Sequence, residues 1–234
     1  MAELNIDLHP AQLQIFHSKK RFKIVAAGRR FGKSYLSAWL LLINAIQSES
    51  KDVFYVAPTF QQGKDIMWSL LKELGQDLIA AAHENTATLT LINGRKIYIK
   101  GSDRPDTLRG NAASFLVLDE YSSMKPVVWE QILRPVLADV RGSCLMISTP
   151  AGKNHFYDTY NDALEDDDWD AFQFNSTDNP FLPEDEVEAA RKNMSSMAFR
   201  QEFEASFETG SGGIFNESWF KVDDEPEEGN FVIA

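Results

Sequence analysis

A single cysteine, Cys144, occurs in the 234 residues of the sequence. No disulfide can form within the chain, which excludes the small disulfide-stapled scaffolds of secreted proteins and is typical of a reducing compartment. The sequence also has no apolar stretch near the length of about 18 residues that a membrane span needs, and no signal peptide is visible at its start. We therefore expect a protein without a membrane partner, in which Cys144 packs as a small buried hydrophobic side chain.

Positive charge is scarce in the last third of the chain. Residues 161–234 hold 4 Lys and Arg against 20 Asp and Glu, whereas residues 1–160 hold 19 against 15. The net charge of −12 therefore comes from the C-terminal part, and the remainder is mildly basic. An acidic total neither excludes nor supports nucleic-acid binding, which depends on a local basic face. The hydrophobic content of 44% is ample for the core of one large domain, or of one domain with an appendage.

A glycine-punctuated loop lies between an apolar run, residues 22–27, and an apolar helix, residues 35–46. The segment reads IVAAGRRFGKS, and this order of strand, loop and helix is that of a phosphate-binding P-loop. Glycines let backbone N–H groups close around phosphate oxygens at the positive end of the helix dipole. In this pattern Lys33 reaches the β- and γ-phosphates of ATP, and the Ser34 hydroxyl binds Mg²⁺. The loop residues predicted to hold the nucleotide are Ala27, Gly28, Arg29, Arg30, Phe31, Gly32, Lys33 and Ser34.

The loop departs from the common P-loop pattern at Ala27, where the first glycine would stand. A small residue can make this turn if its backbone does not need a positive φ. The alternative is an ordinary glycine-rich turn with a solvated basic pair, Arg29 and Arg30. The flanking strand and helix favour the nucleotide site.

Residues 115–118 are apolar and run into Asp119 and Glu120, about 85 residues after the P-loop. Many strands end in acidic residues, so the pattern alone is weak, but downstream of a P-loop it predicts a Walker B strand. Asp119 would then lie on the Mg²⁺ side of the triphosphate, and Glu120 would polarise the attacking water. Glu120 thus predicts the class of ATPases in which a catalytic glutamate follows the Walker B aspartate.

In that class an additional strand lies between the two Walker strands. Residues 144–147 form the next apolar strand, which runs into Ser148, Thr149 and Pro150. The end of such a strand would face the γ-phosphate, where hydroxyl groups could sense whether the phosphate is present. A plain turn closed by proline accounts for the same residues equally well.

The other apolar patterns indicate an α/β fold with a mostly parallel central sheet flanked by helices. Residues 53–57 suit a strand buried on both faces, and residues 64–82 have apolar side chains at helical spacing. Residues 88–100 read as a hairpin, in which the pair Asn93-Gly94 predicts a type I′ turn.

Residues 9–17 read as a short helix upstream of the P-loop strand. This helix carries Gln12, whose flat amide could pair with the edge of an adenine ring. A lone glutamine on a helix is more often a surface residue, so both interpretations stay open from spacing alone.

Several motifs together resemble the N-terminal ATPase domain of large terminase subunits, the motors that package DNA into tailed-phage and herpesvirus-type capsids. The motifs occur in the order of the family and cover nearly the whole chain. They are AAGRRFGKS, GSDRPDTLRG before FLVLDE, VVWEQILRPVL, ISTPAGKNHFYDTY, NPFLPEDE and FRQEFEASF. The missing first glycine and the added arginine of the P-loop are similar to the family's own variant.

The resemblance implies roles for two arginines. Arg29 matches the P-loop arginine that contacts the phosphates. Arg109, in the LRG motif, matches an arginine proposed to act as a finger on the ATP of the neighbouring subunit. The alternative is that Arg109 pairs with Asp103 or Asp106 and only holds its own loop in place.

The resemblance also matches Gln12 to the glutamine that contacts adenine, and Ser148-Thr149-Pro150 to the motif that couples hydrolysis to movement. The catalytic residues that it implies are Glu120, Arg29, Arg109 and Lys33. The residues expected to hold Mg²⁺ are Ser34 and Asp119, and Thr149 is expected beside the nucleotide.

Three parts of the chain follow from the resemblance. Residues 1–175 correspond to a P-loop ATPase core, residues 176–209 to a small lid subdomain, and residues 210–234 to a linker and the first strand of a truncated RNase H-type nuclease domain. The implied activity is hydrolysis of Mg-ATP that drives double-stranded DNA into a procapsid. The implied partners are double-stranded DNA, other copies of the chain in a ring expected to be a pentamer, the portal protein and the small terminase subunit. The implied location is the host cytoplasm and, transiently, the portal vertex.

Two other classes of protein share part of this pattern. A helicase-like translocase of superfamily 1 or 2 would have the P-loop, Walker B and the upstream glutamine, but also a second RecA-like domain that the acidic C-terminal part does not resemble. A non-hydrolysing assembly scaffold would not need an intact Lys33, Ser34, Asp119 and Glu120.

Overall fold

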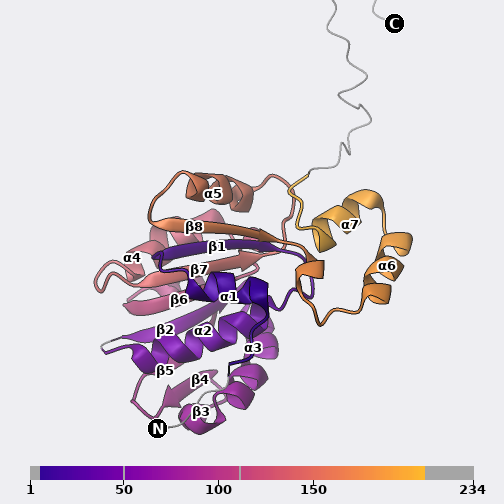
Figure 1. Ribbon diagram of the computed structural model, residues 1–234. Helices are drawn as coiled ribbons and strands as arrows, with labels where there is room; N and C mark the ends of the chain where they lie inside the picture. The colour runs from indigo at the N-terminus through magenta and orange to yellow at the C-terminus, as the bar shows by residue number, and fades with distance from the viewer. Residues whose placement is uncertain (1–5, 50, 111, 209–234) are drawn as a thin grey trace, which may run out of the picture.

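A mostly parallel β-sheet organises the part of the chain that the computed structural model describes, residues 6–49, 51–110 and 112–208 (Figure 1). Its eight strands lie in the order β3-β4-β5-β2-β6-β7-β1-β8. Within this sheet β4 is antiparallel to both of its neighbours, and the other pairs of neighbouring strands are parallel. The strands are β1 (Phe22–Ala27), β2 (Asp52–Ala57), β3 (Ile79–His83), β4 (Thr88–Leu91), β5 (Lys96–Gly101), β6 (Ala113–Asp119), β7 (Ser143–Ser148) and β8 (Trp169–Phe174).

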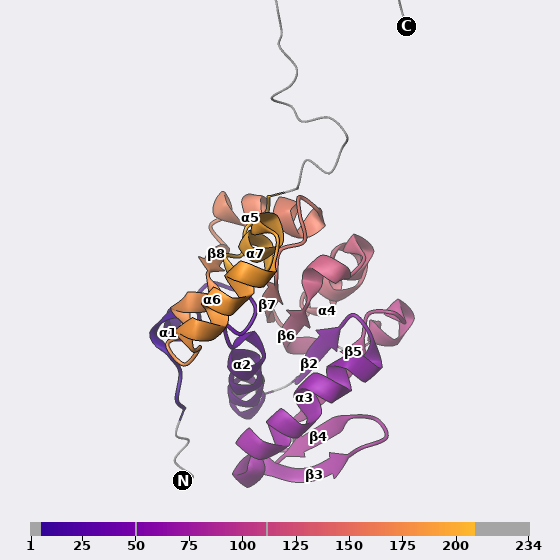
Figure 2. The same cartoon turned by 90° about the vertical axis from the view of Figure 1, so that its right-hand side faces the viewer.

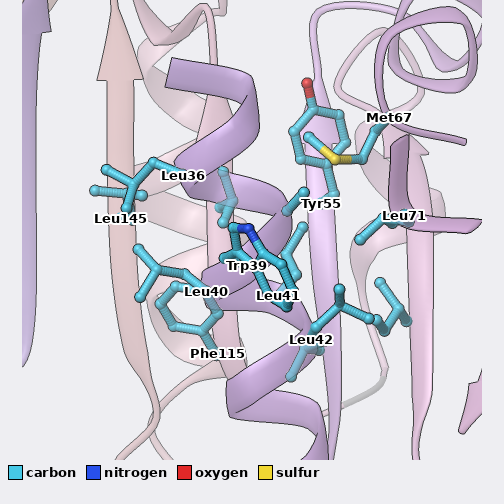
Figure 3. Close-up of a cluster of buried hydrophobic side chains, with 14 of the residues drawn as sticks. Leu36, Trp39, Leu40, Leu41, Leu42, Tyr55, Met67, Leu71, Phe115 and Leu145 are labelled. Atoms are coloured by element: carbon cyan, nitrogen blue, oxygen red, sulfur yellow. The ribbon is translucent and has the colours of Figure 1, made fainter. Parts of the chain in front are cut away.

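The central strands are buried on both faces, which explains why they read as continuous apolar runs rather than as alternating ones. On one face the sheet packs against α1 (Pro10–His17), α2 (Lys33–Gln47) and α3 (Phe60–Leu74). On the other face it packs against a π-helical turn (Val128–Leu133), α4 (Arg134–Val136) and α5 (His155–Leu164). Figure 3 shows leucines of α2 facing the strands that carry Phe115 and Leu145. The result is a three-layer α/β arrangement with one core on each side of the sheet.

The predicted P-loop strand begins and ends where the sequence indicated, at Phe22 and Ala27. The predicted additional strand is confirmed as β7, which lies between β1 and β6. Register pairs Ala26 with Ser148 and Ile147 with Asp119, so these three strands end together at one edge of the sheet. The ends of parallel strands in an open α/β sheet are where ligands bind.

A C-terminal helical segment, residues 176–208, follows β8. It contains a 3₁₀ turn (Ser176–Asp178), α6 (Glu184–Asn193) and α7 (Ser196–Phe203). The two helices pack against each other beside the sheet, on the side away from α4 (Figures 1 and 2). The expected lid falls on this segment, whereas the expected linker and nuclease strand, residues 210–234, lie outside the described residues.

The helix predicted over residues 64–82 is wrong in its second half. The helix α3 ends at Leu74, and Gly75 follows it as the C-cap. A Cβ atom on Gly75 would lie 2.7 Å from a methyl carbon of Leu42, so the chain turns here close against α2. Residues Ile79–His83 then form β3, because pairing with β4 outweighs the helical propensity of three consecutive alanines.

The hairpin between β4 and β5 is confirmed, but its turn is not of type I′. Gly94 has a φ of 81°, whereas Asn93 is not among the residues with positive φ, as a type I′ turn would require. The turn is closed by the Gly94 N–H, which donates to the Leu91 carbonyl at 2.8 Å. The Asn93 amide instead donates to the carbonyls of Ala45 and Ile46 at the end of α2, at 2.9 and 3.0 Å. A long-range helix contact therefore decides the conformation of this turn.

Among the described residues, no helix combines the length and the apolar character needed to cross a lipid bilayer.

Candidate active site

The P-loop connects β1 to α2, and the Lys33 side chain folds back to bond the start of the loop. The Lys33 ammonium lies 2.7 Å from the Ala27 carbonyl, 2.9 Å from the Gly28 carbonyl and 3.0 Å from the Thr149 hydroxyl. Burial lowers the pKa of Lys33 from its ordinary value, and the nearby carboxylate of Glu120 acts in the opposite direction. Gly32 has a φ of 97° and opens α2, whereas Ala27 ends β1 as an ordinary buried strand residue. The absence of the first glycine therefore does not disturb the loop.

The P-loop is bonded to the start of α1, by its N-cap residue His9 and by Gln12. His9 Nε2 lies 2.9 Å from the Phe31 carbonyl, and the Gln12 amide donates to the Gly32 carbonyl at 2.9 Å. The side-chain oxygen of Gln12 accepts the His9 backbone N–H at 3.1 Å. Gln12 is buried, and both ends of its amide are bonded to protein atoms. The adenine contact of Gln12 stays a prediction, while His9 is a P-loop support that the sequence did not reveal.

The backbone of Phe31 is part of the P-loop, and its ring packs in the hydrophobic core. The side chain is fully buried and stacks on Phe174 of β8, with ring centroids 5.1 Å apart. This stacking ties the middle of the loop to the edge strand of the sheet.

Asp119 ends β6 beneath the cleft and is almost completely buried. Its carboxylate accepts the Glu120 backbone N–H at 2.9 Å and the hydroxyl of Tyr55. Burial raises the pKa of Asp119 to about 6, although the hydrogen bond from Tyr55 acts to lower it. Tyr55 lies in the buried strand β2, next to β6 in the sheet, and was not singled out from the sequence.

Glu120 has a left-handed backbone, with φ of 53° and ψ of 45°. Such a conformation costs a non-glycine residue of order 1–3 kcal/mol and persists only where the surroundings enforce it. It turns the chain out of β6 into a 3₁₀ turn (Tyr121–Ser123). The Ser148 hydroxyl lies 3.2 Å from the Glu120 carboxylate and 2.7 Å from the Ser122 hydroxyl. The end of β7 therefore touches the turn that carries Glu120.

The P-loop, Glu120 and Thr149 line one cleft of about 670 Å³, whereas the predicted residues Gln12, Ala27, Gly28 and Asp119 lie behind its lining. The predicted residues that line it are Arg29, Arg30, Phe31, Gly32, Lys33, Ser34, Glu120 and Thr149. The cleft also includes side chains that the sequence did not indicate, Gln62 and Ile66 of α3 and Gln201 and Glu202 of α7. The described residues hold no cluster of three or more His, Cys, Asp or Glu that could cage a metal ion. A hydroxyl and a carboxylate are oxygen ligands of the kind that Mg²⁺ uses together with phosphate oxygens. Ser34 lines the cleft and Asp119 is buried beside Glu120, so their role as Mg²⁺ ligands stays a prediction.

The C-terminal helical segment bonds to the first half of the P-loop, at Arg29 and Arg30. The Arg29 guanidinium pairs with the Glu202 carboxylate at 2.5 Å, and the Arg29 N–H donates to the Glu202 carbonyl at 2.7 Å. The Ser176 hydroxyl donates to the Arg29 carbonyl at 2.6 Å, and the Asn179 amide donates to the Arg30 carbonyl at 2.7 Å. Arg30 has a positive φ of 62° within this contact. The arginine expected to meet the phosphates is thus paired with α7.

Arg109 lies apart from this cleft. It borders a separate hollow of about 300 Å³, together with Gln131 and Asp139. Its guanidinium is 3.5 Å from the Asp106 carboxylate, and both side chains are exposed. This is the local ion pair considered as the alternative, and such a pair at the surface is weak. An exposed Arg109 on a loop turned at Gly110, whose φ is 86°, is also what a finger directed at another subunit requires.

Comparisons with known proteins identify the family of the chain. Residues 24–222 match the family described as terminase large subunit, T4likevirus-type, N-terminal. The chain belongs to the terminase large subunit family. It is 30% identical over 208 residues to the large terminase subunit of Escherichia phage T5, covering 85% of this chain and 46% of that protein. The chain therefore spans about half the length of the curated relatives that it matches.

Solved structures show the same fold. The large terminase ATPase domain of Thermus phage P74-26 superposes with a TM-score of 0.76 at 23% identity, covering 86% of this chain and 94% of that domain. The large terminase of another thermophilic bacteriophage, in complex with ATP-gamma-S, superposes with a TM-score of 0.75 at 15% identity, covering 86% and 53%. These structures show that the fold is α/β. The family match shows that the chain corresponds to the N-terminal ATPase domain of a large terminase subunit.

Gly28 of this terminase domain lies where the P-loop and the helical segment meet. A Cβ atom there would lie 2.4 Å from the Ser176 hydroxyl and 2.6 Å from the Phe203 carbonyl. Gly28→Ala should therefore force the segment away from the loop and cost about 1–3 kcal/mol of stability, as overpacking does. Amide hydrogen exchange at Arg29, whose N–H is bonded to Glu202, should become faster. Gly63→Ala is the control, because its Cβ would meet only side-chain carbons at 3.0 Å or more; equal effects of the two variants would contradict this interpretation.

The buried carboxyl of Asp119 should make the terminase domain less stable as pH rises. Its folded-state pKa of about 6 lies above the unfolded value of about 3.9, so the folded state binds more protons between these values. The contribution of the protonated Asp119 carboxyl to the free energy of unfolding is complete below about pH 4 and is lost as pH rises through about 6. Without Mg²⁺ or nucleotide, Asp119→Asn should be more stable than the wild type at pH 7 by up to about 3 kcal/mol, and by much less at pH 4. Urea unfolding across this range measures it, with the exposed Asp106→Asn as control; a difference that does not change with pH would refute the assignment.

Proposed function

We propose that this domain hydrolyses Mg-ATP and that the hydrolysis drives translocation of double-stranded DNA into a procapsid. The observation that carries the proposal is the meeting of Lys33, Glu120 and Thr149 in one cleft, at the ends of three adjacent parallel strands. Membership of the terminase family supplies the biological setting. The large terminase of a thermophilic bacteriophage has been described with both ADP and ATP-gamma-S, which supports the same ligand here.

The topology supports assignment to the P-loop ATPases that have an additional strand and a catalytic glutamate. The strand β7 lies between the P-loop strand β1 and the Walker B strand β6. Glu120 directly follows Asp119 and lines the cleft, so it can orient a water for in-line attack on the γ-phosphate. The Thr149 hydroxyl, at the end of β7, would contact the phosphate from the other side.

The positive groups of the cleft would stabilise the charge that spreads over the phosphoryl oxygens in the transition state. Lys33 would leave the Ala27 and Gly28 carbonyls, which it now contacts, for the β- and γ-phosphates. Ser34 and Asp119 would hold Mg²⁺, which would supply further positive charge against the phosphate oxygens. Arg29 would exchange the Glu202 carboxylate for phosphate oxygens, and Gln12 would turn an amide edge toward adenine.

Residues 176–209 are proposed to act as a lid that moves on the ATPase core of residues 1–175. The contacts of Ser176, Asn179 and Glu202 with the P-loop support this role, because they join the segment to the element that changes partners when nucleotide binds. The curated relatives are about twice as long as this chain, which leaves room for a nuclease domain in the whole protein. Its proposed partners are double-stranded DNA, further copies of the chain in a ring, the portal protein and the small terminase subunit, in the host cytoplasm.

Substitution of Glu120 should separate binding from chemistry. Glu120→Gln should keep ATP affinity and lose turnover by about 10²-fold or more, since the water loses its general base. Lys33→Ala should weaken ATP binding itself, because it removes the charge that meets the phosphates. Phosphate release and binding of a fluorescent nucleotide analogue measure the two effects. Wild-type turnover by Glu120→Gln would refute its catalytic role, and absence of hydrolysis by the wild type in an assembled motor would favour a scaffold.

Mixing of variants tests whether Arg109 acts on a neighbouring subunit. Fingers supplied in trans are worth roughly 10³–10⁵ in turnover. Arg109→Ala subunits mixed with Glu120→Ala subunits should regain partial activity under conditions of assembly, because some interfaces then pair an intact Arg109 with an intact Glu120. A mixture that is no more active than the separate variants, with assembly confirmed by sedimentation, would leave Arg109 only its pair with Asp106.

A further inference from the structure

We propose that Asn154 and His155, at the start of α5, are positioning residues that hold the turn after β6 and thereby aim the carboxylate of Glu120. The proposal rests on the proposed function, since it assumes that Glu120 is the catalytic carboxylate. It adds two residues that contact neither the phosphates nor the metal in that function.

The strained backbone at Glu120 needs an external support. The 3₁₀ turn that follows is closed by only two internal hydrogen bonds, Ser123 N–H to the Glu120 carbonyl at 2.9 Å and Met124 N–H to the Tyr121 carbonyl at 3.0 Å. One turn with so few bonds cannot by itself enforce a left-handed residue at its start. The Asp119 carboxylate accepts the Glu120 N–H at 2.9 Å, and the other supporting contacts come from elsewhere in the fold.

Asn154 and His155 supply these contacts from a distant part of the chain. The Asn154 amide donates to the Ser122 carbonyl at 3.1 Å, and His155 Nε2 lies 2.9 Å from the Tyr121 carbonyl. A carbonyl oxygen only accepts, so the proton of the His155 ring is on Nε2. The His155 ring also packs edge-on against the Tyr121 ring, with centroids 4.9 Å apart. Two consecutive carbonyls of the turn are therefore held by two consecutive side chains.

The free end of the Glu120 side chain is held by a different element, β7. The Ser148 hydroxyl lies 3.2 Å from the carboxylate, and the Ser122 N–H donates to the same hydroxyl at 3.3 Å. The turn is thus held by α5 at the Tyr121 and Ser122 carbonyls and by β7 at the Ser122 N–H, and β7 also approaches the carboxylate. Release from α5 would free the two carbonyls and let the Glu120 carboxylate shift relative to Ser148.

The helix α5 is itself fixed by a capping hydrogen bond and by aromatic packing. The side-chain oxygen of Asn154 caps the helix by accepting the Phe156 N–H at 3.0 Å. The rings of Phe156, Tyr157 and Tyr160 surround Phe207, the residue near the end of the helical segment, with centroids 5.2–5.5 Å away. Asn154 therefore uses its oxygen for α5 and its nitrogen for the turn, and these two roles can be separated.

The test uses substitutions that remove one role and keep the other. Asn154→Asp keeps the capping oxygen and loses the donor to Ser122. His155→Phe keeps the aromatic packing and loses the donor to Tyr121, whereas His155→Gln restores a donor at a similar distance along the side chain. Asn161→Asp is the matched control, because the Asn161 amide donates only within α5, to the Tyr157 carbonyl at 2.9 Å.

Asn154→Asp and His155→Phe should each lower kcat by about tenfold to hundredfold, as expected when a catalytic group is displaced by about 1 Å. The KM for ATP and the affinity for ADP should change by less than about twofold, and His155→Gln should recover most of the loss. Amide exchange at Ser123 and Met124 should become faster in the two damaging variants and not in Asn161→Asp. Unchanged exchange and kcat would overturn the proposal, and so would a loss of kcat that only follows a loss of Tm or ADP affinity. Glu120→Gln, assayed alongside, tests the catalytic assignment separately, because the exchange measurement does not depend on activity.

Discussion

The charges of Lys33, Asp119 and Glu120 meet at the edge of the sheet where β1, β6 and β7 end, where Asp119 is buried and Lys33 and Glu120 are partly buried. A buried charge is costly unless it is paired or hydrogen-bonded. Lys33 finds two P-loop carbonyls and Thr149, and Asp119 finds Tyr55 and the N–H of Glu120. Most of the polar contacts of the site follow from this requirement. In the proposed function, a triphosphate with its metal would pair with the same charges.

The P-loop is held on two sides by parts of the chain that are far apart in sequence. His9 and Gln12, at the start of α1, bond its second half, at Phe31 and Gly32. The C-terminal helical segment bonds its first half, at Arg29 and Arg30. Most of these contacts are to backbone carbonyls or N–H groups, so they fix the path of the loop rather than its side chains. A change in that path has to move either α1 or the helical segment, and α1 is packed into the core by Ile15. The buried residues of α6 and α7, Val187 and Phe199, belong to neither of the two core clusters.

The sequence was sufficient for the parts of the fold that rest on local patterns. The apolar runs predicted β1, β2, β6 and β7, and the P-loop pattern predicted Lys33 in the cleft. The errors occur where tertiary contacts override local preference. Ala80, Ala81 and Ala82 favour a helix but lie in a strand paired with β4, and Asn93 gives up a type I′ turn to cap α2. The partners, β4 for the alanines and the end of α2 for Asn93, are distant in sequence, so the residues around each position could not reveal them.

Tyr55 shows which piece of information was missing for the site. A tyrosine inside a fully buried strand needs a partner for its hydroxyl, so the sequence already implied that one exists. The partner is Asp119, 64 positions away, and it is within reach only because β2 and β6 are neighbours in the sheet. Arg29 and Glu202, which are 173 positions apart, meet because α7 lies against the P-loop. The arrangement of strands and helices, rather than residue type, decides which of the polar side chains meet, and that arrangement is a property of the whole fold. Motifs therefore identify the groups that are proposed to touch the ligand, while the groups that hold those in place become visible only with the topology.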